Sequence, residues 1–139
     1  MAYDLILTAR GGERYGAAQR VSSLSWSGSI KQVSRELEAV LVTPPAGSLP
    51  ELPSANGSGA QLDIDGELRF TGVAVNRSRS TDESTTTMTA LDRGYYLAGN
   101  EGWYTFSDAA PEQAVAALCA DFGIPVGRLA ATGVRVARK

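Results

Sequence analysis

Apolar and polar residues alternate with a period of two along the first three-quarters of the chain, and this is the period of a β-strand. In the segment that begins at Val21, one face carries serines and the other is largely apolar. The apolar face comprises Leu24, Trp26, Gly28 and Ile30. We therefore predict a half-buried strand in which Trp26 points into the core. Its expected neighbours there are Leu37, Leu41 and Phe70.

The same alternation returns after a short polar connection at residues 31–35. Residues 36–43 read as a return strand, since Leu37, Ala39 and Leu41 alternate with glutamates. An antiparallel pair follows from two such strands. Residues 4–9 form another short expected strand, followed by a turn-rich stretch that holds Gly11, Gly12 and Gly16.

The sharpest local signal is Asp65-Gly66 between two alternating runs, which predicts a tight β-hairpin. The inward face is expected to hold Leu62, Ile64, Leu68 and Phe70. Apolar positions then shift to Val73 and Val75, so a bulge or sharp bend is predicted at Thr71-Gly72. Residues 84–91 form a Thr-rich strand, and residues 77–83 are expected to be the turn that precedes it.

Residues 44–59 carry four of the six prolines and predict a long loop, because proline cannot donate to a ladder. Neither side of the loop has enough strands to close a core alone, so we expect no domain boundary here. Proline limits the entropy lost on ordering. We therefore expect this loop to dock on a neighbouring subunit in an assembly.

The last quarter of the chain changes to helical spacing. A helix is predicted within residues 109–123, capped by Asp108 or a neighbour, with Pro111 in its first turn and Gly123 as its stop. Its apolar stripe comprises Val115, Leu118, Cys119 and Phe122. Residues 134–139 look like the start of another strand. The predicted fold is therefore mainly β with one amphipathic helix (α+β), an antiparallel barrel or twisted sheet, in one domain over residues 1–139.

Composition excludes several functions. The chain of 139 residues has no histidine and one cysteine, which removes His-based catalytic triads, the usual zinc enzymes and disulfides. The net charge of −2 offers no basic excess for nucleic acid or an anionic membrane. No apolar run is long enough for a transmembrane helix, and Asp4 stands where an export signal needs positive charge. We expect neither a membrane nor a specific nucleic-acid partner.

Few residues suggest chemistry. Asp63, Asp65 and Glu67 could hold a metal ion or act as acid and base, but their spacing on a hairpin favours turn chemistry and solvated charge. Cys119 lies on the apolar helix stripe, where a thiol packs as a small hydrophobe. The glycines at 11, 12 and 16 do not link a strand to a helix, so a phosphate-binding loop is disfavoured.

Two arginines and two aromatic pairs remain. Arg77 and Arg79 are expected to lie solvated in a hairpin turn. The pairs Tyr95-Tyr96 and Trp103-Tyr104 could stack on bases or sugars, but core or interface packing is favoured because no basic residues are interleaved with them. We therefore predict no catalytic residue, no metal site, no cofactor and no enzymatic activity.

An ordered set of segments resembles the XkdQ-like phage tail proteins, and together these segments span nearly the whole chain. They are residues 21–30 (VSSLSWSGSI), 34–38 (SRELE), 70–73 (FTGV), 90–92 (ALD), 95–97 (YYL) and 114–127, which ends in FGIPVG.

The resemblance implies a baseplate hub of a contractile phage tail or tail-like bacteriocin. Such hubs are trimers that join the tail tube to the central spike, and a barrel-like domain in them mimics the tube subunit. The implied partners are copies of this chain, the tube and spike proteins, and possible tape-measure and LysM-type hub proteins. Family members are much longer, which implies a fragment or a split, shortened hub. The implied location is the virion tail or baseplate, assembled in the bacterial cytoplasm.

Two alternatives stay open at this point. One is another tail component of the same tube-like fold, a distal-tail or tube-initiator protein. The other is a small carbohydrate- or nucleic-acid-binding β-barrel that uses its exposed aromatic residues.

Overall fold

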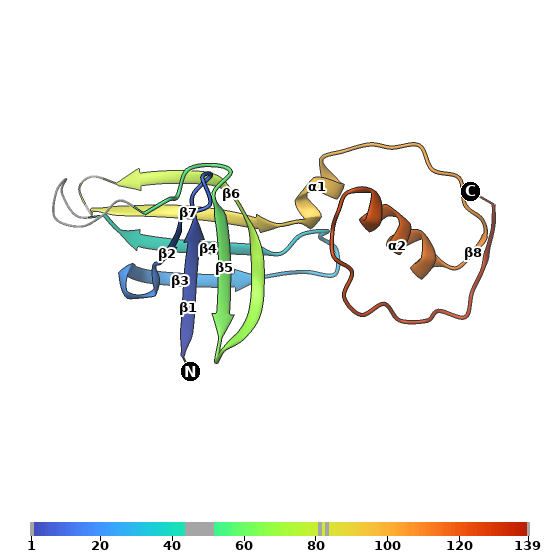
Figure 1. The fold of residues 1–139 in the computed structure, drawn as a ribbon, viewed down its shortest axis with the longest axis horizontal. Helices are drawn as coiled ribbons and strands as arrows, with labels where there is room; N and C mark the ends of the chain where they lie inside the picture. Colours follow the sequence, from blue (N-terminus) through green and yellow to red (C-terminus); the bar gives the residue numbers. More distant parts are fainter. Residues whose placement is uncertain (1, 44–51, 81, 83, 139) are drawn as a thin grey trace. The chain divides into compact units, whose positions relative to one another are not determined.

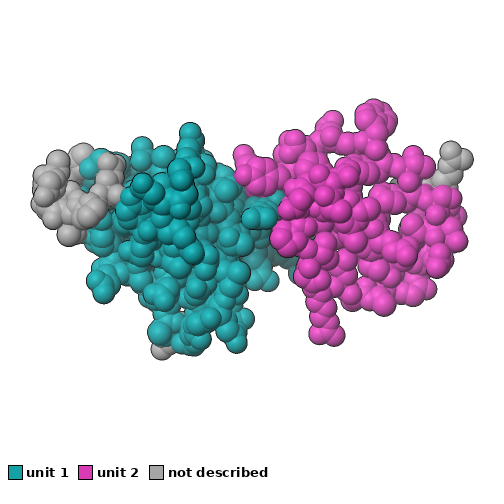
Figure 2. All heavy atoms as spheres, viewed as in Figure 1, with its two compact units in different colours: residues 1–93 teal, residues 94–139 magenta. Residues whose placement is uncertain are grey.

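The computed structural model describes all residues except 1, 44–51, 81, 83 and 139. The chain divides into two compact units, residues 1–93 and residues 94–139, which Figure 2 colours separately. The assignment of residues 1–139 to a single tube-like hub domain stays a prediction.

Unit 1 is one antiparallel sheet of seven strands in the order β2-β1-β5-β6-β7-β4-β3. The sheet curls into a half-barrel, which confirms the predicted fold class (Figure 1). Its strands are β1 (Tyr3–Thr8), β2 (Arg14–Gly16), β3 (Val21–Ser27), β4 (Glu36–Val42), β5 (Gly59–Ile64), β6 (Glu67–Ser80) and β7 (Thr85–Asp92).

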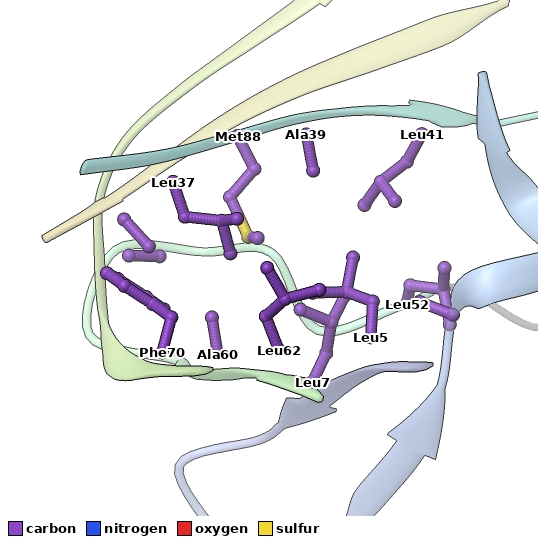
Figure 3. Close-up of a cluster of buried hydrophobic side chains, with 13 residues drawn as sticks. Leu5, Leu7, Leu37, Ala39, Leu41, Leu52, Ala60, Leu62, Phe70 and Met88 are labelled. Atoms are coloured by element: carbon purple, nitrogen blue, oxygen red, sulfur yellow. The ribbon is translucent and has the colours of Figure 1, made fainter. Parts of the chain in front are cut away.

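The inner face of the curled sheet holds the core. Leu37, Ala39 and Leu41 alternate inward along β4 and are fully buried, as their spacing predicted. Figure 3 shows the side chains of β4 and β7 directed toward those of β1, β5 and β6 across the same space. Removing one such leucine side chain typically costs about 2–5 kcal/mol of stability, because the cavity left behind collapses only in part.

The strand predicted from Val21 is shorter than expected. β3 ends at Ser27, and Ile30, which was assigned to its inward face, is fully exposed at 104%. The reason is a turn that begins at Ser29, whose carbonyl accepts from Gln32 N and whose Oγ accepts from Lys31 N, and that has Ile30 at a central position. Serine favours such local bonds over a ladder. Trp26 is partly buried and packs against the core, with Leu37 as its cross-strand partner.

The Asp-Gly hairpin is confirmed. Asp65 and Gly66 have φ of 51° and 80°, the pair of positive values that a type I′ turn requires. Leu68, however, is 59% exposed, which corrects its assignment to the inward face. The register shifts between Leu62 and Asp63, so β6 carries an extra residue before Phe70 and the phase of the strand changes there.

The predicted bulge at Thr71-Gly72 is therefore misplaced. A second register shift falls between Ala74 and Asn76. Gly72 still marks a point of close approach, because a Cβ atom there would collide with the carbonyl of Leu91 and lie 2.8 Å from the Phe70 ring. Glycine allows β6 to pair with both neighbours at this corner of the half-barrel.

Two further elements differ from the prediction. Residues 77–80 continue β6 and pair with β7, so Arg77 and Arg79 lie on a strand rather than in a turn. The glycine-rich stretch after β1 contains a short strand, β2, which pairs with β1. Its turn residue Gly12 has φ of 94°, a value that glycine adopts without strain.

A 3-10 helix, η1 (Ala18–Arg20), connects the two edge strands β2 and β3 along the sequence. On one side, Ala17 N donates to Leu5 O of β1 over 2.7 Å. On the other side, the Arg20 guanidinium donates to Val42 O of β4 over 2.9 and 3.2 Å. This segment therefore bonds to strands on both sides of the opening of the half-barrel.

The described part of the proline-rich loop packs on its own sheet. Leu52, Ser54 and Ser58 are buried, and Gly57 N and Ser58 O bond to the backbone of Ala74. Residues 44–51 of the predicted loop lie outside the described residues, and the assembly role of the loop stays a prediction.

Unit 2 contains α1 (Gly94–Ala98), β8 (Ser107–Ala109), α2 (Pro111–Asp121) and β9 (Val136–Arg138). The predicted helix and the predicted strand near the end of the sequence are both present, and β8 and β9 pair as a two-stranded sheet. None of the described helices combines the length and the apolar composition that a bilayer-spanning helix needs.

The ends of α2 match its sequence signals. Ala110, a neighbour of Asp108, is the N-cap, and its backbone N–H donates to Gln113 Oε1 over 3.0 Å. Gly123 has φ of 64° and Ile124 N donates to Cys119 O, which closes the C-terminus as a Schellman-type stop. Val115 is 42% exposed, which corrects its place on the apolar stripe.

Candidate assembly surface

The three candidate carboxylates each have a structural partner. Asp65 accepts from Ala2 N over 3.0 Å, and Asp63 accepts from the Gln61 side chain. Glu67 pairs with Arg69 at 2.6 Å on the exposed face. Among the described residues, no cluster of three or more metal-ligating side chains is found. These groups therefore stabilise the hairpin and its contact with the N-terminal residues.

Cys119 is buried on α2 with 8% of its surface exposed, which fits the predicted packing role. The glycines at 11 and 12 belong to the β1–β2 turn, where Gly12 N donates to Ala9 O. Gly11 and Gly12 are therefore turn residues of the half-barrel in unit 1, whereas Cys119 belongs to unit 2.

Unit 2 carries much of the exposed apolar surface. Trp103 is fully exposed at 102%, and Tyr95 and Tyr96 are each 43% exposed. The prediction of core packing is thus wrong for the Trp103 side chain, and the interface and stacking alternatives stay predictions. Other exposed apolar residues of this unit are Val115, Val126, Leu129 and Val134. Exposed aromatic residues are frequent anchors of protein–protein contacts.

A mainly apolar cavity of about 330 Å³ lies at the N-terminus of α2, between that helix and the β8–β9 pair. Tyr104 and Phe106 line it and stack with their centroids 6.2 Å apart. The hydrogen bond from Tyr104 Oη to Asp121 is 2.8 Å long and raises the pKa of this phenol. Tyr104 is therefore a protonated donor at neutral pH rather than a reactive base.

Glu112, at the start of α2, has a lowered pKa. Its carboxylate accepts from its own backbone N–H and from Thr132 Oγ1 at 2.8 Å, and both bonds lower its pKa. The bond to Thr132 ties the first turn of α2 to the segment that leads into β9. The negative charge of Glu112 also lies at the start of α2, where the helix macrodipole stabilises it.

Unit 1 presents two sheet edges. Within the described residues, β2 and β3 each pair with one strand only. β2 is three residues long, whereas β3 has seven residues and carries no charge and no proline. An unprotected edge of this length is a site for adding another strand. Sequence reasoning found β3 but not its edge position, because strand order depends on contacts distant in sequence.

Comparison with known proteins gives two sequence relatives. A family model described as YQBQ-like matches residues 24–139. The phage-like element PBSX protein XkdQ of Bacillus subtilis is 31% identical over 111 residues, which cover 80% of this chain and 33% of XkdQ. The uncharacterized protein YqbQ of the same organism is 29% identical over 82% of this chain and 34% of its own length. The chain therefore spans about a third of these relatives.

Solved structures give the same fold. The 43 kDa tail protein of prophage MuSo2 from Shewanella oneidensis superposes with a TM-score of 0.70 and 23% identity, over 98% of this chain and 44% of that protein. A tail protein from Neisseria meningitidis has a TM-score of 0.62 and 14% identity, over 87% of this chain and 34% of its own. At these identities the likeness concerns the fold.

Proposed function

Because the chain belongs to the YQBQ-like family and is similar in sequence to XkdQ, we propose that it is a structural component of a phage tail or tail-like particle. The more specific role that we propose is that of a baseplate hub in a contractile tail, linking the tube to the central spike. The sequence relationship to a phage-like element protein carries this proposal. The tail-protein fold of its structural neighbours supports it.

In this role the half-barrel of unit 1 would present its sheet to tube subunits, and the exposed apolar residues of unit 2 would contact further tail proteins. In this role the protein would act by binding other proteins through its surface, and no side chain would need to react. The side chains that resembled chemical groups support this, because each of them has a structural partner or lies buried in the fold. We propose a non-enzymatic protein that assembles with copies of itself and with the tube and spike proteins.

Co-assembly tests the proposal. The full chain is mixed with the tube protein and the spike protein of the same particle, and complexes are examined by size-exclusion chromatography and electron microscopy. A ring or cap that binds both proteins is the expected result for a hub. Binding to the tube protein without the spike protein would contradict the hub role and favour a distal-tail role. Binding to neither would contradict a tail role.

A further inference from the structure

The connection between β3 and β4 encloses a groove in unit 1, which we call the β3 groove. Its volume is about 490 Å³, and it is lined by Trp26, Ser27, Gly28, Ser29, Ile30 and Arg35. Ile30 stands fully exposed at its rim. The groove thus combines an aromatic wall, an apolar rim and a cation.

Arg35 is fixed at its backbone by Asp92, and its side chain lies against Gly28 and Trp26. Its backbone N–H donates to Asp92 Oδ2 over 3.0 Å, and its carbonyl accepts from Asp92 N over 3.1 Å. Its stem passes over Gly28, where a Cβ atom would lie 2.9 Å from Arg35 Cγ. The guanidinium carbon then lies 5.3 Å from the centre of the Trp26 ring, within the range of a cation–π contact.

Two donors in this groove have no acceptor among the described residues. The Trp26 indole Nε1 is buried without a hydrogen-bond partner there. The ion pairs among the described residues join Glu67 to Arg69 and Asp108 to Arg135, so the Arg35 guanidinium forms no ion pair with a described carboxylate. Indole and guanidinium groups donate and do not accept, so a carboxylate is a suitable partner for either. The Arg35 guanidinium is exposed and open to hydration, whereas the Trp26 N–H is buried. A buried donor left unpaired costs about 1–3 kcal/mol.

The groove continues into the open edge of β3. The strand carries no charged residue and no proline that would oppose the addition of another strand. Lys31 is exposed on the same connection and adds a second positive charge. Main-chain bonds along the edge would give affinity to an extended peptide, and the charged groove would select its side chains.

We propose that the β3 groove binds an extended acidic segment of a partner protein. The segment adds to the edge of β3, directs a carboxylate to Arg35 and packs an apolar side chain against Ile30. The Trp26 N–H is covered in the free chain. It becomes available when the exposed Arg35 guanidinium turns toward the arriving carboxylate. The proposal rests on the contacts of Trp26 and Arg35, so it stands or falls independently of the hub role.

Peptide titration followed by NMR tests the proposal on the full chain. The probe is the blocked peptide Ac-Val-Glu-Val-Glu-Val-NH2, and the reference is the same peptide with Gln in place of Glu. The Trp26 indole N–H signal is assigned by comparison with the Trp103→Phe variant. We expect a saturable downfield shift of the Trp26 signal with the acidic peptide and binding at least about tenfold weaker with the Gln peptide, as loss of a charge-assisted hydrogen bond implies.

Matched variants separate the groove from general charge. Arg35→Gln should weaken binding of the acidic peptide about tenfold or more, whereas Arg79→Gln, on the exposed part of β6, should leave it unchanged. Trp26→Phe keeps an aromatic wall and should weaken binding measured by calorimetry. Equal binding of both peptides, or an equal effect of both arginine variants, would overturn the proposal. So would the same signal shift with sodium acetate alone, or self-association that Arg35→Gln abolishes.

Discussion

At the scale of single residues, glycine positions show how local space determines the fold. Gly72 and Gly11 both lack a side chain, but their surroundings differ. A Cβ atom at Gly72 would meet the Leu91 carbonyl and the Phe70 ring, whereas a Cβ atom at Gly11 would meet nothing within 4 Å. The first glycine is required by the corner of the half-barrel, and the second occupies an open turn.

The substitution Gly72→Ala is expected to destabilise unit 1 by about 2–3 kcal/mol, because β6 and β7 must separate to make room for the methyl group. Chemical denaturation followed by circular dichroism measures the effect. Gly11→Ala is the matched control and should change the free energy of unfolding by less than about 0.5 kcal/mol. Equal effects of the two substitutions would contradict the close approach at Gly72.

Trp103 offers a second test at this scale. Its side chain is fully exposed, so Trp103→Ser should leave the melting temperature unchanged. If this residue belongs to an assembly contact, the variant should bind the tube or spike protein at least about tenfold more weakly, since exposed aromatic residues are frequent anchors of interfaces. Leu68→Ser, at an exposed apolar position of unit 1, is the control. Undiminished co-assembly of the Trp103 variant would remove this residue from the interface.

At the scale of elements, six of the strands of unit 1 could be predicted, and β3, β4, β5 and β6 followed from the period of two because each has one face on the core. Prediction failed where a local bond or an extra residue changed the phase, at Ile30 and at Leu68. It also missed β2 and η1, which have little apolar pattern and depend on contacts with β1 and β4. Of the proposed groove, Trp26 could be predicted, but Arg35 could not. Its position depends on Asp92, which is distant in sequence.

The η1 segment, which has little apolar pattern in its sequence, gives a testable prediction. Arg20→Met keeps the aliphatic stem but removes the two bonds from the guanidinium to Val42 O. We expect a loss of about 1–2 kcal/mol and faster hydrogen exchange in β3 and β4, because η1 connects the two sides of the opening. Arg79→Met on the exposed part of β6 is the control. Unchanged exchange in the Arg20 variant would show that η1 contributes no stability.

Acid should weaken α2 through Glu112. Its pKa in the folded chain lies below the ordinary value of 4.5, because its backbone N–H and Thr132 donate to the carboxylate. The stabilisation is therefore present above pH 4.5 and is lost as the pH falls through the lower, folded value. Helix signals of unit 2, followed by NMR from pH 6 to about pH 3, should weaken in that window. Glu112→Gln should remove this part of the pH dependence. An unaltered pH profile of the variant would contradict the assignment.

At the scale of the whole molecule, the buried residues are divided very unevenly. All thirteen members of the main buried cluster belong to unit 1, whereas Cys119 is the buried apolar residue found among the described residues of unit 2. The two units therefore differ in how much stability they hold by themselves. Hydrophobic burial is the main favourable term in folding.

We accordingly expect residues 1–93 to fold when produced alone. Residues 94–139 produced alone should show little cooperative unfolding. Calorimetry and NMR of both pieces, with the full chain as control, measure this difference. Independent, cooperative folding of the second piece would contradict it.

The order of strands in the sheet has a consequence for synthesis of the chain. β1 pairs with β5 and β4 pairs with β7. Tyr3 therefore cannot pair until Ile64 has been synthesised, and Leu37 cannot pair with β7 until Ala90 has been synthesised. During translation the first half of unit 1 leaves the ribosome before most of its partners exist, and only short local pairs form early. Such non-local pairing makes folding slow. The nascent chain exposes the Leu-rich faces of β1 and β4 until β7 has emerged, and in that interval it is most open to chaperones and to aggregation.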